Sequence, residues 1–346
     1  MTRATWLRIH RILGLAMAAF LLVQALTGAV LLYRGPLARA IDPIGMTSRA
    51  SGPAISAGQA AARASRFLTG YQVTRLFAPD AEGATWFTQL RNADGRTAYA
   101  SVDPAGGDVL RTGGIAAFPV EAALQIHYRL MAGKAGMIIV TLNALALLTM
   151  ASSGLAYWWP KRKPAKALAI RWTLAPRLVL RQAHRTLGVL AAAFLILLAA
   201  TGLLLIIPEL AAGDAPPVSS AASAVEIDRS LALAQSAFPA AGLRDFRVYG
   251  DRLIVNFRAP ERNARAVHRV VVTITKPHIL AATNAQQNGA LWMTILPIHS
   301  GDVLAPIGPA LLLIVALALA TLALSGPIMW WQAAAQRRRP ARKAPA

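Results

Sequence analysis

The sequence predicts an all-α four-helix membrane bundle that carries two α+β modules outside the membrane and is built as an internal two-fold repeat. The composition is the first reason: 55% of the 346 residues are hydrophobic and only 15% are charged, which is richer in apolar residues than an ordinary soluble domain. The second reason is that the excess lies in four long apolar segments, at residues 12–33, 135–159, 186–208 and 304–331. The third is that the same short motifs recur in both halves of the chain.

Two sets of motifs repeat along the chain. The first set is a His-Arg-x-x-Gly opening and a Thr-Gly closing, found at 10–14 and 27–28 and again 174 residues later at 184–188 and 201–202. The second set repeats with an offset of 172 residues. It comprises His127, Gly136, Ser153-Gly154 and Trp158-Trp159, which correspond to His299, Gly308, Ser325-Gly326 and Trp330-Trp331. The sequence therefore predicts an internal repeat of one unit, and each copy contains two of the repeated histidines.

The four apolar segments are predicted to be transmembrane helices. Each reaches or exceeds the roughly 20 apolar residues that cross a hydrocarbon core about 30 Å thick, and none has a charged residue in its interior. The first segment also resembles a signal peptide, with Ala38-Arg39-Ala40 as a cleavage site. Its apolar run is longer than the roughly 7–15 residues of a signal core, and its counterpart at 186 is internal. We therefore expect the first helix to be retained.

The formal net charge of +21 is distributed as a topology signal and not as a nucleic-acid-binding patch. Residues 1–11, 160–185 and 332–346 contain sixteen basic residues and no acidic one, whereas the segments 34–126 and 209–298 each hold nine basic and seven acidic residues. Lys and Arg gather on the cytoplasmic side of short loops and attract anionic lipids. We expect both termini and the connector inside, and the two large loops outside.

Each outer loop is predicted to form a helix followed by a small antiparallel sheet. In the first, a helix at 56–68 with Ser56 as N-cap precedes strands at 73–77, 85–90 and 97–102, with turns at 92–95 and 103–107. In the second, a flexible stretch at 212–223 precedes a helix at 226–237. Strands follow it at 245–249, 253–258 and 267–275, with Gly250-Asp251 as a turn.

A helix followed by strands that end in Val102-Asp103-Pro104-Ala105-Gly106-Gly107-Asp108-Val109-Leu110 resembles the PepSY module. Two such modules between membrane helices resemble the PepSY-associated transmembrane family, which includes inner-membrane ferric-siderophore reductases that carry haem in a helix bundle. The His-Arg-x-x-Gly openings and the Ser-Gly-x-x-x-Trp-Trp endings are the most specific parts of this resemblance. The second module matches less well, because its last strand runs into Thr275-Lys276-Pro277-His278 without an Asp-Pro-x-Gly turn. The resemblance implies a bacterial inner-membrane protein with periplasmic loops.

The predicted domain boundaries follow the apolar segments and the basic runs. They are helix one with the cytoplasmic N-terminus at 1–33, the first PepSY-like module at 34–126, helix two at 127–159, the basic connector at 160–185, helix three at 186–208, the second module at 209–298, helix four at 299–331 and the basic tail at 332–346.

Four of the six histidines are expected to bind two b-type haems. The predicted topology places His10 and His184 at the inner face and His127 and His299 at the outer face. We call these the inner pair and the outer pair. Two neutral imidazoles on facing helices can take both axial positions of a haem iron, so all four are candidate ligands of haem iron. A single histidine at a helix end is otherwise an interfacial residue. No catalytic residue is assigned.

Glycines and arginines near these histidines suit the same hypothesis. Gly14 and Gly188 follow a histidine by four residues, on the same helical face, and leave room for a macrocycle. The Thr-Gly pairs at 27–28 and 201–202 lie about five turns further on and predict a notch for the outer haem. Arg11 and Arg185 suit haem propionates. The alternative is that these arginines mark the inner face and reach the headgroups.

Other conspicuous residues are predicted to have ordinary roles. His268 and His278 are expected at the surface of the second module, and the two Trp-Trp pairs at the inner membrane interface. Trp86 and Trp292 are expected to pack. Cysteine is absent from the sequence, and no nucleotide-binding or metalloprotease motif is present. An external donor, either a cytoplasmic flavoprotein or a quinol, is therefore expected to supply electrons. No nucleophile–base–acid set favours hydrolysis.

These patterns and the resemblance predict an oxidoreductase that passes electrons across the membrane to a periplasmic ferric siderophore or another ferric chelate. Two alternatives stay open. One is a haem-free membrane protein whose PepSY modules bind or regulate a periplasmic partner such as a peptidase. The other is a haem oxidoreductase with a different acceptor.

Overall fold

The computed structural model describes residues 2–49, 51–159, 167–211 and 222–337. Part of the predicted connector, most of the stretch at 212–223 and the end of the basic tail lie outside these residues. The chain divides into two compact units. One, which we call the bundle, comprises residues 1–32, 123–211 and 298–346; the other, the sheet unit, comprises 33–122 and 212–297.

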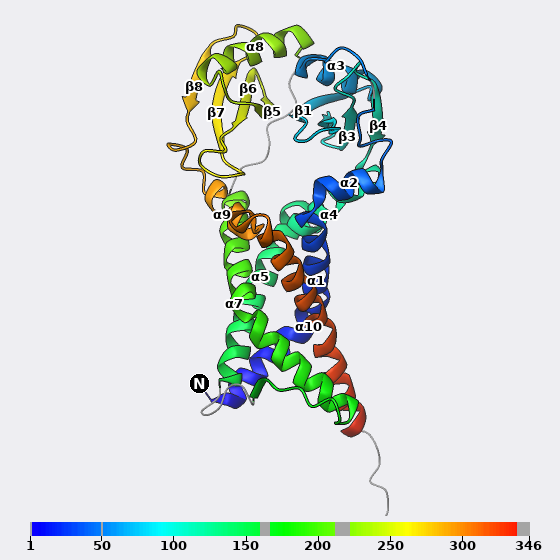
Figure 1. Ribbon diagram of the computed structural model, residues 1–346, viewed down its shortest axis with the longest axis vertical. Coiled ribbons are helices and arrows are strands. Elements are labelled where there is room, and N and C mark those ends of the chain that lie inside the picture. The colour runs from blue at the N-terminus through cyan, green and yellow to red at the C-terminus, as the bar shows by residue number, and fades with distance from the viewer. Residues whose placement is uncertain (1, 50, 160–166, 212–221, 338–346) are drawn as a thin grey trace, which may run out of the picture. The chain divides into compact units, whose positions relative to one another are not determined.

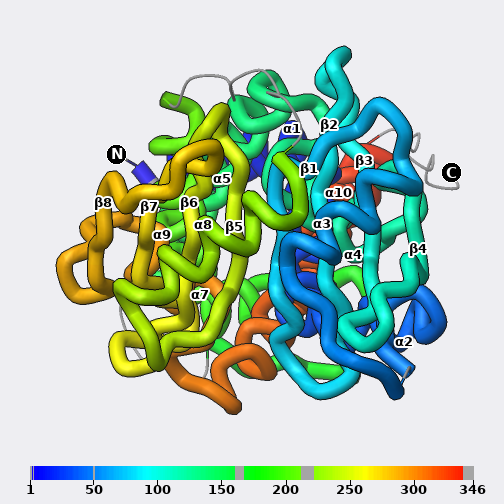
Figure 2. The backbone as a smooth tube through the Cα atoms, turned by 90° about the horizontal axis from the view of Figure 1, so that it is seen from above, coloured from blue at the N-terminus to red at the C-terminus, as the bar shows by residue number. Residues whose placement is uncertain are grey.

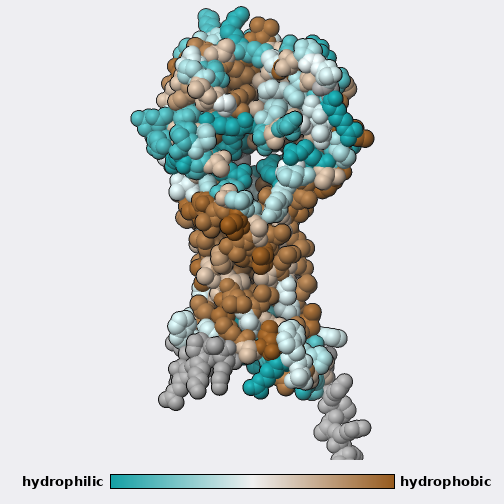
Figure 3. Space-filling view, in the orientation of Figure 1, coloured by the Kyte–Doolittle hydropathy of each residue, from teal (hydrophilic) through white to brown (hydrophobic). Residues whose placement is uncertain are grey.

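Four long helices form the bundle, as the sequence predicts. They are α1 (Arg3–Leu32), α5 (Gly133–Trp158), α7 (Pro176–Ala211) and α10 (Ile307–Arg337), and each is long and apolar enough to cross a membrane. Helices α1 and α7 each pack against both α5 and α10 (Figure 1). Small side chains such as Ala191 and Ala318 are buried between the helices, while hydrophobic side chains cover the visible outer face (Figure 3). The protein is therefore a multi-pass membrane protein.

The bounds of these helices correct the predicted domain limits. Helix α7 begins at Pro176 and not at residue 186, and α10 extends to Arg337. The second and fourth segments do not begin at a histidine. His127 lies in a separate helix, α4 (Pro119–Arg129), and His299 lies in α9 (Trp292–His299). Hydropathy marks the part of a helix that crosses lipid, so it misses helical turns that carry charge.

A tight turn separates each of these short helices from the long helix that follows. After α4, Leu130 and Met131 both have positive φ, and after α9 the chain passes through a short 3₁₀ helix, η2 (Asp302–Leu304). The repeated glycines close these turns. A Cβ on Gly136 would collide with the carbonyl of Arg129, and one on Gly308 would collide with the carbonyl of Gly301. Close backbone approach therefore explains why both copies of the repeat have glycine here.

One antiparallel sheet of eight strands forms the sheet unit. Its order is β4-β3-β2-β1-β5-β6-β7-β8. The strands are β1 (Tyr71–Phe77), β2 (Trp86–Asn92), β3 (Thr97–Val102), β4 (Val109–Gly113), β5 (Leu243–Tyr249), β6 (Arg252–Arg258), β7 (Val267–Thr273) and β8 (Ile279–Thr283). The two loops meet where β1 pairs with β5, with Leu76 opposite Phe246. The order reads the same outward from this seam in both directions.

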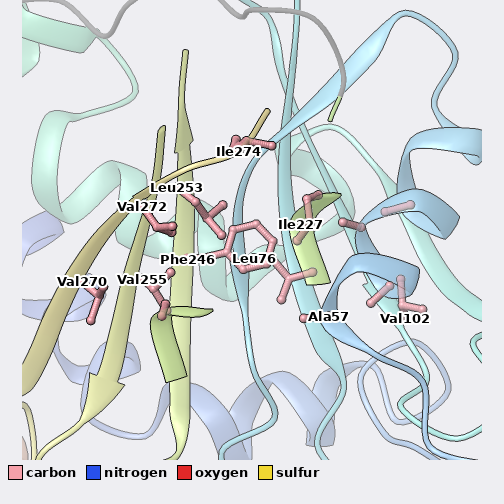
Figure 4. Packing of buried hydrophobic residues seen from close by; sticks show 14 of the residues in the cluster. Ala57, Leu76, Val102, Ile227, Phe246, Leu253, Val255, Val270, Val272 and Ile274 are labelled. Atoms are coloured by element: carbon pink, nitrogen blue, oxygen red, sulfur yellow. The ribbon is translucent and has the colours of Figure 1, made fainter. Parts of the chain in front are cut away.

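Two helices cover one face of the sheet. They are α3 (Ala57–Phe67) and α8 (Ala224–Ala237), which lie across the strands in Figure 2. The apolar side chains of this face form the core, where Leu76, Phe246 and Leu253 are fully buried (Figure 4). The shorter elements α2 (Arg34–Ile41) and η1 (Ile115–Ala117) flank the first half of the unit.

Each outer loop forms a helix followed by antiparallel strands, as predicted, but the strands of both loops belong to one sheet. Ser56 caps α3 through a capping box with Gln59, and β3 has the predicted bounds. The sequence missed β4 and β8, which are short edge strands with no alternation of buried and exposed positions. The sequence also predicted two independent sheets, one in each loop. The pairing of β1 with β5 joins them, and this pairing leaves no local sequence signal.

A half-buried carboxylate joins α8 to the start of α3. Asp228 accepts a hydrogen bond from the Ser56 hydroxyl at 2.5 Å and one from the backbone N–H of Gly58 at 2.8 Å. The second contact places a negative charge at a helix N-terminus, where it is stabilising. The contact therefore links α3 of the first loop to α8 of the second loop.

We predict that Asp228→Asn lowers the free energy of unfolding of the sheet unit by about 1–3 kcal/mol, because charge-assisted hydrogen bonds at the start of α3 are weakened. Hydrogen exchange followed by mass spectrometry should show faster exchange at residues 57–61. Asp94→Asn, on the exposed hairpin between β2 and β3, is the control and should leave exchange unchanged. Equal exchange in both variants would contradict this role.

Candidate functional site

The four histidines of the repeat meet in two pairs inside the bundle. His10 on α1 and His184 on α7 have ring centroids 6.5 Å apart with planes at 89°. His127 on α4 and His299 on α9 have ring centroids 6.4 Å apart with planes at 57°. Each pair takes one histidine from each half of the chain.

Each imidazole is fixed by a hydrogen bond at Nδ1 to an atom of another helix. The partners are Met150 O for His10 at 2.9 Å, Ser325 Oγ for His184 at 2.7 Å, Thr27 Oγ1 for His127 at 3.1 Å and Thr201 Oγ1 for His299 at 2.8 Å. Helix α1 therefore supplies one histidine and holds another, and α7 does the same.

These partners assign the tautomer of three of the four rings. A backbone carbonyl only accepts, so Nδ1 of His10 carries the proton. The hydroxyls of Thr27 and Thr201 each donate to a carbonyl one turn back, at 2.7 Å, and so accept from the imidazole. His10, His127 and His299 therefore have an N–H at Nδ1 and an unprotonated Nε2. The Ser325 hydroxyl lies 2.7 Å from Nδ1 of His184 and 3.3 Å from the carbonyl of Leu322, so its one hydrogen can serve either atom.

Glycines give the rings space against the neighbouring helices. A Cβ would lie 3.1 Å from His127 Cε1 at Gly28 and 3.2 Å from His10 Cε1 at Gly154, which is closer than an ordinary contact, so these two positions need glycine. At Gly202 and Gly326 the corresponding distances, 3.5 Å to His299 and 3.8 Å to His184, are ordinary contacts. The notch for a macrocycle at the Thr-Gly pairs stays a prediction. The sequence did not reveal that Gly154 lies against His10.

The spacing within each pair fits a metal bound between two imidazoles. A metal lies about 2.0–2.1 Å from an imidazole nitrogen, so with roughly 1.2 Å from nitrogen to ring centre the centroids come about 6.5 Å apart. Among the described residues, no three or more His, Cys, Asp or Glu side chains gather into a metal-binding group. A metal at either pair must therefore bring its remaining ligands, as iron does in a porphyrin.

Two half-buried arginines lie next to the pairs in sequence. The Nε atoms of Arg185, adjacent to His184, and of Arg129, two residues after His127, are buried and have no hydrogen-bond partner. Arg11 is exposed. The buried Nε of Arg185 suits the predicted propionate contact, and for the exposed Arg11 this contact stays a prediction. Arg129 was missed by the sequence, because His299 is followed by glycine at the equivalent position and the repeat gave no signal.

The other glycines of the opening motif do not contact a histidine. A Cβ at Gly14 would lie 3.4 Å from Met150 Cε, and one at Gly188 would lie 3.7 Å from Leu322 Cδ2. Packing between protein atoms therefore tolerates a side chain at both positions. The predicted role of these glycines, room for a macrocycle, stays a prediction.

The remaining histidines lie in the sheet unit and have structural partners. His268 is only 15% exposed, and its Nε2 lies 3.1 Å from Glu261. Its ring stacks on Phe238 with centroids 4.3 Å apart. The prediction of a surface position is therefore wrong for His268, whereas His278 is exposed.

Trp86 and Trp292 pack as the sequence predicts, whereas the position of the two Trp-Trp pairs at the inner interface stays a prediction. Trp86 packs against the core of the sheet, and Trp292 lies beneath the guanidinium of Arg244, 5.3 Å from its carbon. Three of the four tryptophans in the two Trp-Trp pairs are exposed, and they are Trp159, Trp330 and Trp331.

We predict that Thr201→Val, which keeps the side-chain shape, changes the tautomer of His299, because the buried Nδ1–H loses its acceptor. In ¹⁵N NMR of metal-free protein with labelled histidine, the protonated Nδ1 signal of His299 should disappear and those of His10 and His127 should stay. Thr141→Val is the control, because the Thr141 hydroxyl donates to Met137 O and not to a histidine. Retention of the His299 signal in Thr201→Val would show that this hydroxyl does not fix the ring.

A family model described as the PepSY-associated TM region matches residues 7–333, which is nearly the whole chain. No curated protein matches the sequence.

Proposed function

The chain belongs to the PepSY-associated TM region family, and we propose that it is a di-haem b-type electron-transfer protein of the bacterial inner membrane. It reduces a ferric siderophore or another ferric chelate in the periplasm. The observation that carries this proposal is the set of four imidazoles with Nδ1 hydrogen-bonded, paired at 6.4–6.5 Å. Haem, when bound, supplies a reversible one-electron iron couple.

The residues present fit two haems. The inner pair supplies Nε2 of His10 and His184, and the outer pair supplies Nε2 of His127 and His299. A ligand imidazole almost always donates its other N–H to a second group, which fixes its orientation and raises its basicity. All four rings have such a group. Arg185 and Arg129 each have a buried, unpartnered Nε and are the residues proposed to contact the propionates.

The two sites lie near opposite ends of the membrane-spanning helices. His10 belongs to the inner pair, and Thr27, which holds His127 of the outer pair, lies 17 residues further along the same helix. At 1.5 Å per residue this is about 25 Å, most of the thickness of a hydrocarbon core. His184 and Thr201 repeat this spacing on α7. Sites near both faces are what transmembrane electron transfer requires.

The direction of transfer follows from the charge distribution. The basic segments at both termini and the connector favour a cytoplasmic location, which makes the sheet unit periplasmic and the outer pair the side of the acceptor. The sequence has no nucleotide-binding motif, so a cytoplasmic flavoprotein or a quinol supplies the electrons. The choice of a ferric chelate as acceptor rests on the family resemblance.

We predict that protein purified from haem-replete cells shows Soret and α-bands that sharpen on reduction with dithionite. His10→Ala and His184→Ala should remove the same haem, and His127→Ala and His299→Ala the other, so that each variant keeps about half of the haem. His278→Ala is the control and should keep all of it. A wild-type protein without these bands would contradict the proposal and favour the haem-free alternative.

We further predict that Arg185→Gln and Arg129→Gln each lower the reduction potential of one haem. A nearby positive charge stabilises the reduced, less positive state, and its loss corresponds to roughly tens of millivolts at an effective dielectric near 20. Arg11→Gln, the exposed counterpart of Arg185, is the matched control. Potentiometric titration followed by absorption measures all three. Unchanged potentials in Arg185→Gln and Arg129→Gln would exclude these arginines as propionate partners.

A further inference from the structure

A cavity of about 370 Å³ lies inside the sheet unit. It is bounded by α2, by the ends of β1 and β6 and by the loop after β6, so both halves of the unit contribute to its wall. This volume is within the range of about 300–1,000 Å³ found for small-molecule sites. The cavity takes no part in holding the histidine pairs.

The wall of the cavity is strongly basic. Five arginines line it, namely Arg34, Arg39, Arg244, Arg258 and Arg265. Three carboxylates also line it, but two of them have cationic partners. Asp42 pairs at 2.7 Å with Arg111, which lies outside the cavity, and Glu121 pairs with Arg34 at 3.7 Å. The wall therefore has five arginines and three carboxylates, an excess of two positive charges.

The nearest carboxylate behind the wall does not balance this charge. Asp245 is fully buried, and it lies 3.0 Å from Arg75, 3.8 Å from Arg244 and 4.0 Å from Arg247. One negative charge thus serves three guanidinium groups. Burial lowers the pKa of Arg244, and the charges of Arg265, Arg247 and Arg258 lower it further, against the opposing effect of Asp245. An anion in the cavity would relieve this repulsion.

Two of the arginines are held in place by backbone carbonyls. Arg258 donates to Pro79 O at 2.9 Å, and Arg244 donates to Arg265 O at 3.0 Å. A guanidinium has five N–H donors in a fixed fork, so each keeps donors for a ligand. Groups that are already ordered lose little freedom on binding, and bidentate pairing suits carboxylates.

Resting on the proposed function, we infer that this cavity binds the acceptor and that the acceptor is a ferric chelate with carboxylate ligands and a net negative charge. The arginines bind the carboxylates. The aromatic side chains of Phe77, Phe87 and Phe118, which also line the cavity, contact the less polar part of the chelate. A neutral or cationic hydroxamate chelate lacks the groups that this wall recognises.

Calorimetric titration of the full-length protein with gallium(III) citrate tests this inference. Gallium(III) replaces iron(III) but is not reduced, so binding is read without electron transfer. Wild type should bind, with an affinity that falls as salt is added. Arg39→Gln and Arg258→Gln should each weaken binding about tenfold, or about 1.4 kcal/mol. Arg96→Gln, on an exposed hairpin outside the cavity, is the matched control.

Two comparison probes make the result specific. Citrate without metal and the gallium complex of a trihydroxamate should both bind at least tenfold more weakly than gallium citrate. Equal binding of either probe would overturn the assignment of the ligand class. Arg39 has no ion pair among the described residues, so Arg39→Gln should fold; unchanged affinity in this variant would overturn the site.

Measuring the haem spectrum of the same protein distinguishes a failure of the cavity site from a failure of the proposed function. Haem bands without any binding of gallium citrate would overturn the cavity site and leave the proposed function intact. Binding by a protein that lacks haem would support the anion site and contradict the proposed function.

Discussion

The arrangement of the bundle depends on hydrogen bonds that half-buried imidazoles make at Nδ1. An unpaired polar group is costly inside lipid, because no water is there to satisfy it. Each ring is therefore turned until its Nδ1 meets a polar group on a neighbouring helix. A threonine or serine hydroxyl, or a carbonyl, provides that group, and a glycine lets His10 and His127 approach closely. This one requirement sets the register of α4 against α1, α9 against α7, α1 against α5 and α7 against α10.

The two halves use the same plan with different chemistry. In the outer pair both acceptors are threonine hydroxyls, whereas in the inner pair His10 binds a backbone carbonyl and His184 binds Ser325. Arg129 has no counterpart after His299. A duplicated unit with such differences offers unequal environments to its two sites. Differences in the charge and hydrogen bonds around a haem set its potential, so the asymmetry would give a directed transfer chain two distinct potentials.

Much of the fold could be predicted because its signals are local or repeated. Apolar length predicts the four long helices, the capping box at Ser56 predicts the start of α3, and the repeat groups the four histidines. The missed features depend on contacts between distant segments. The break at Leu130 and Met131 has no proline or run of glycines to mark it. The role of Ser325-Gly326 requires knowing that α10 faces α7, and a motif by itself does not show which helix it faces.

The pairing of β1 with β5 is the clearest case of a contact that its own residues disfavour. Pairing β1 with β5 sets Arg75 opposite Arg247, and like charges in this position are destabilising. Asp245 lies close enough to contact both, yet a single carboxylate does not neutralise them together with Arg244. Two independent sheets would have avoided this concentration of charge. The joined sheet does what two separate sheets could not, because only the assembled unit brings arginines of both halves to one cavity.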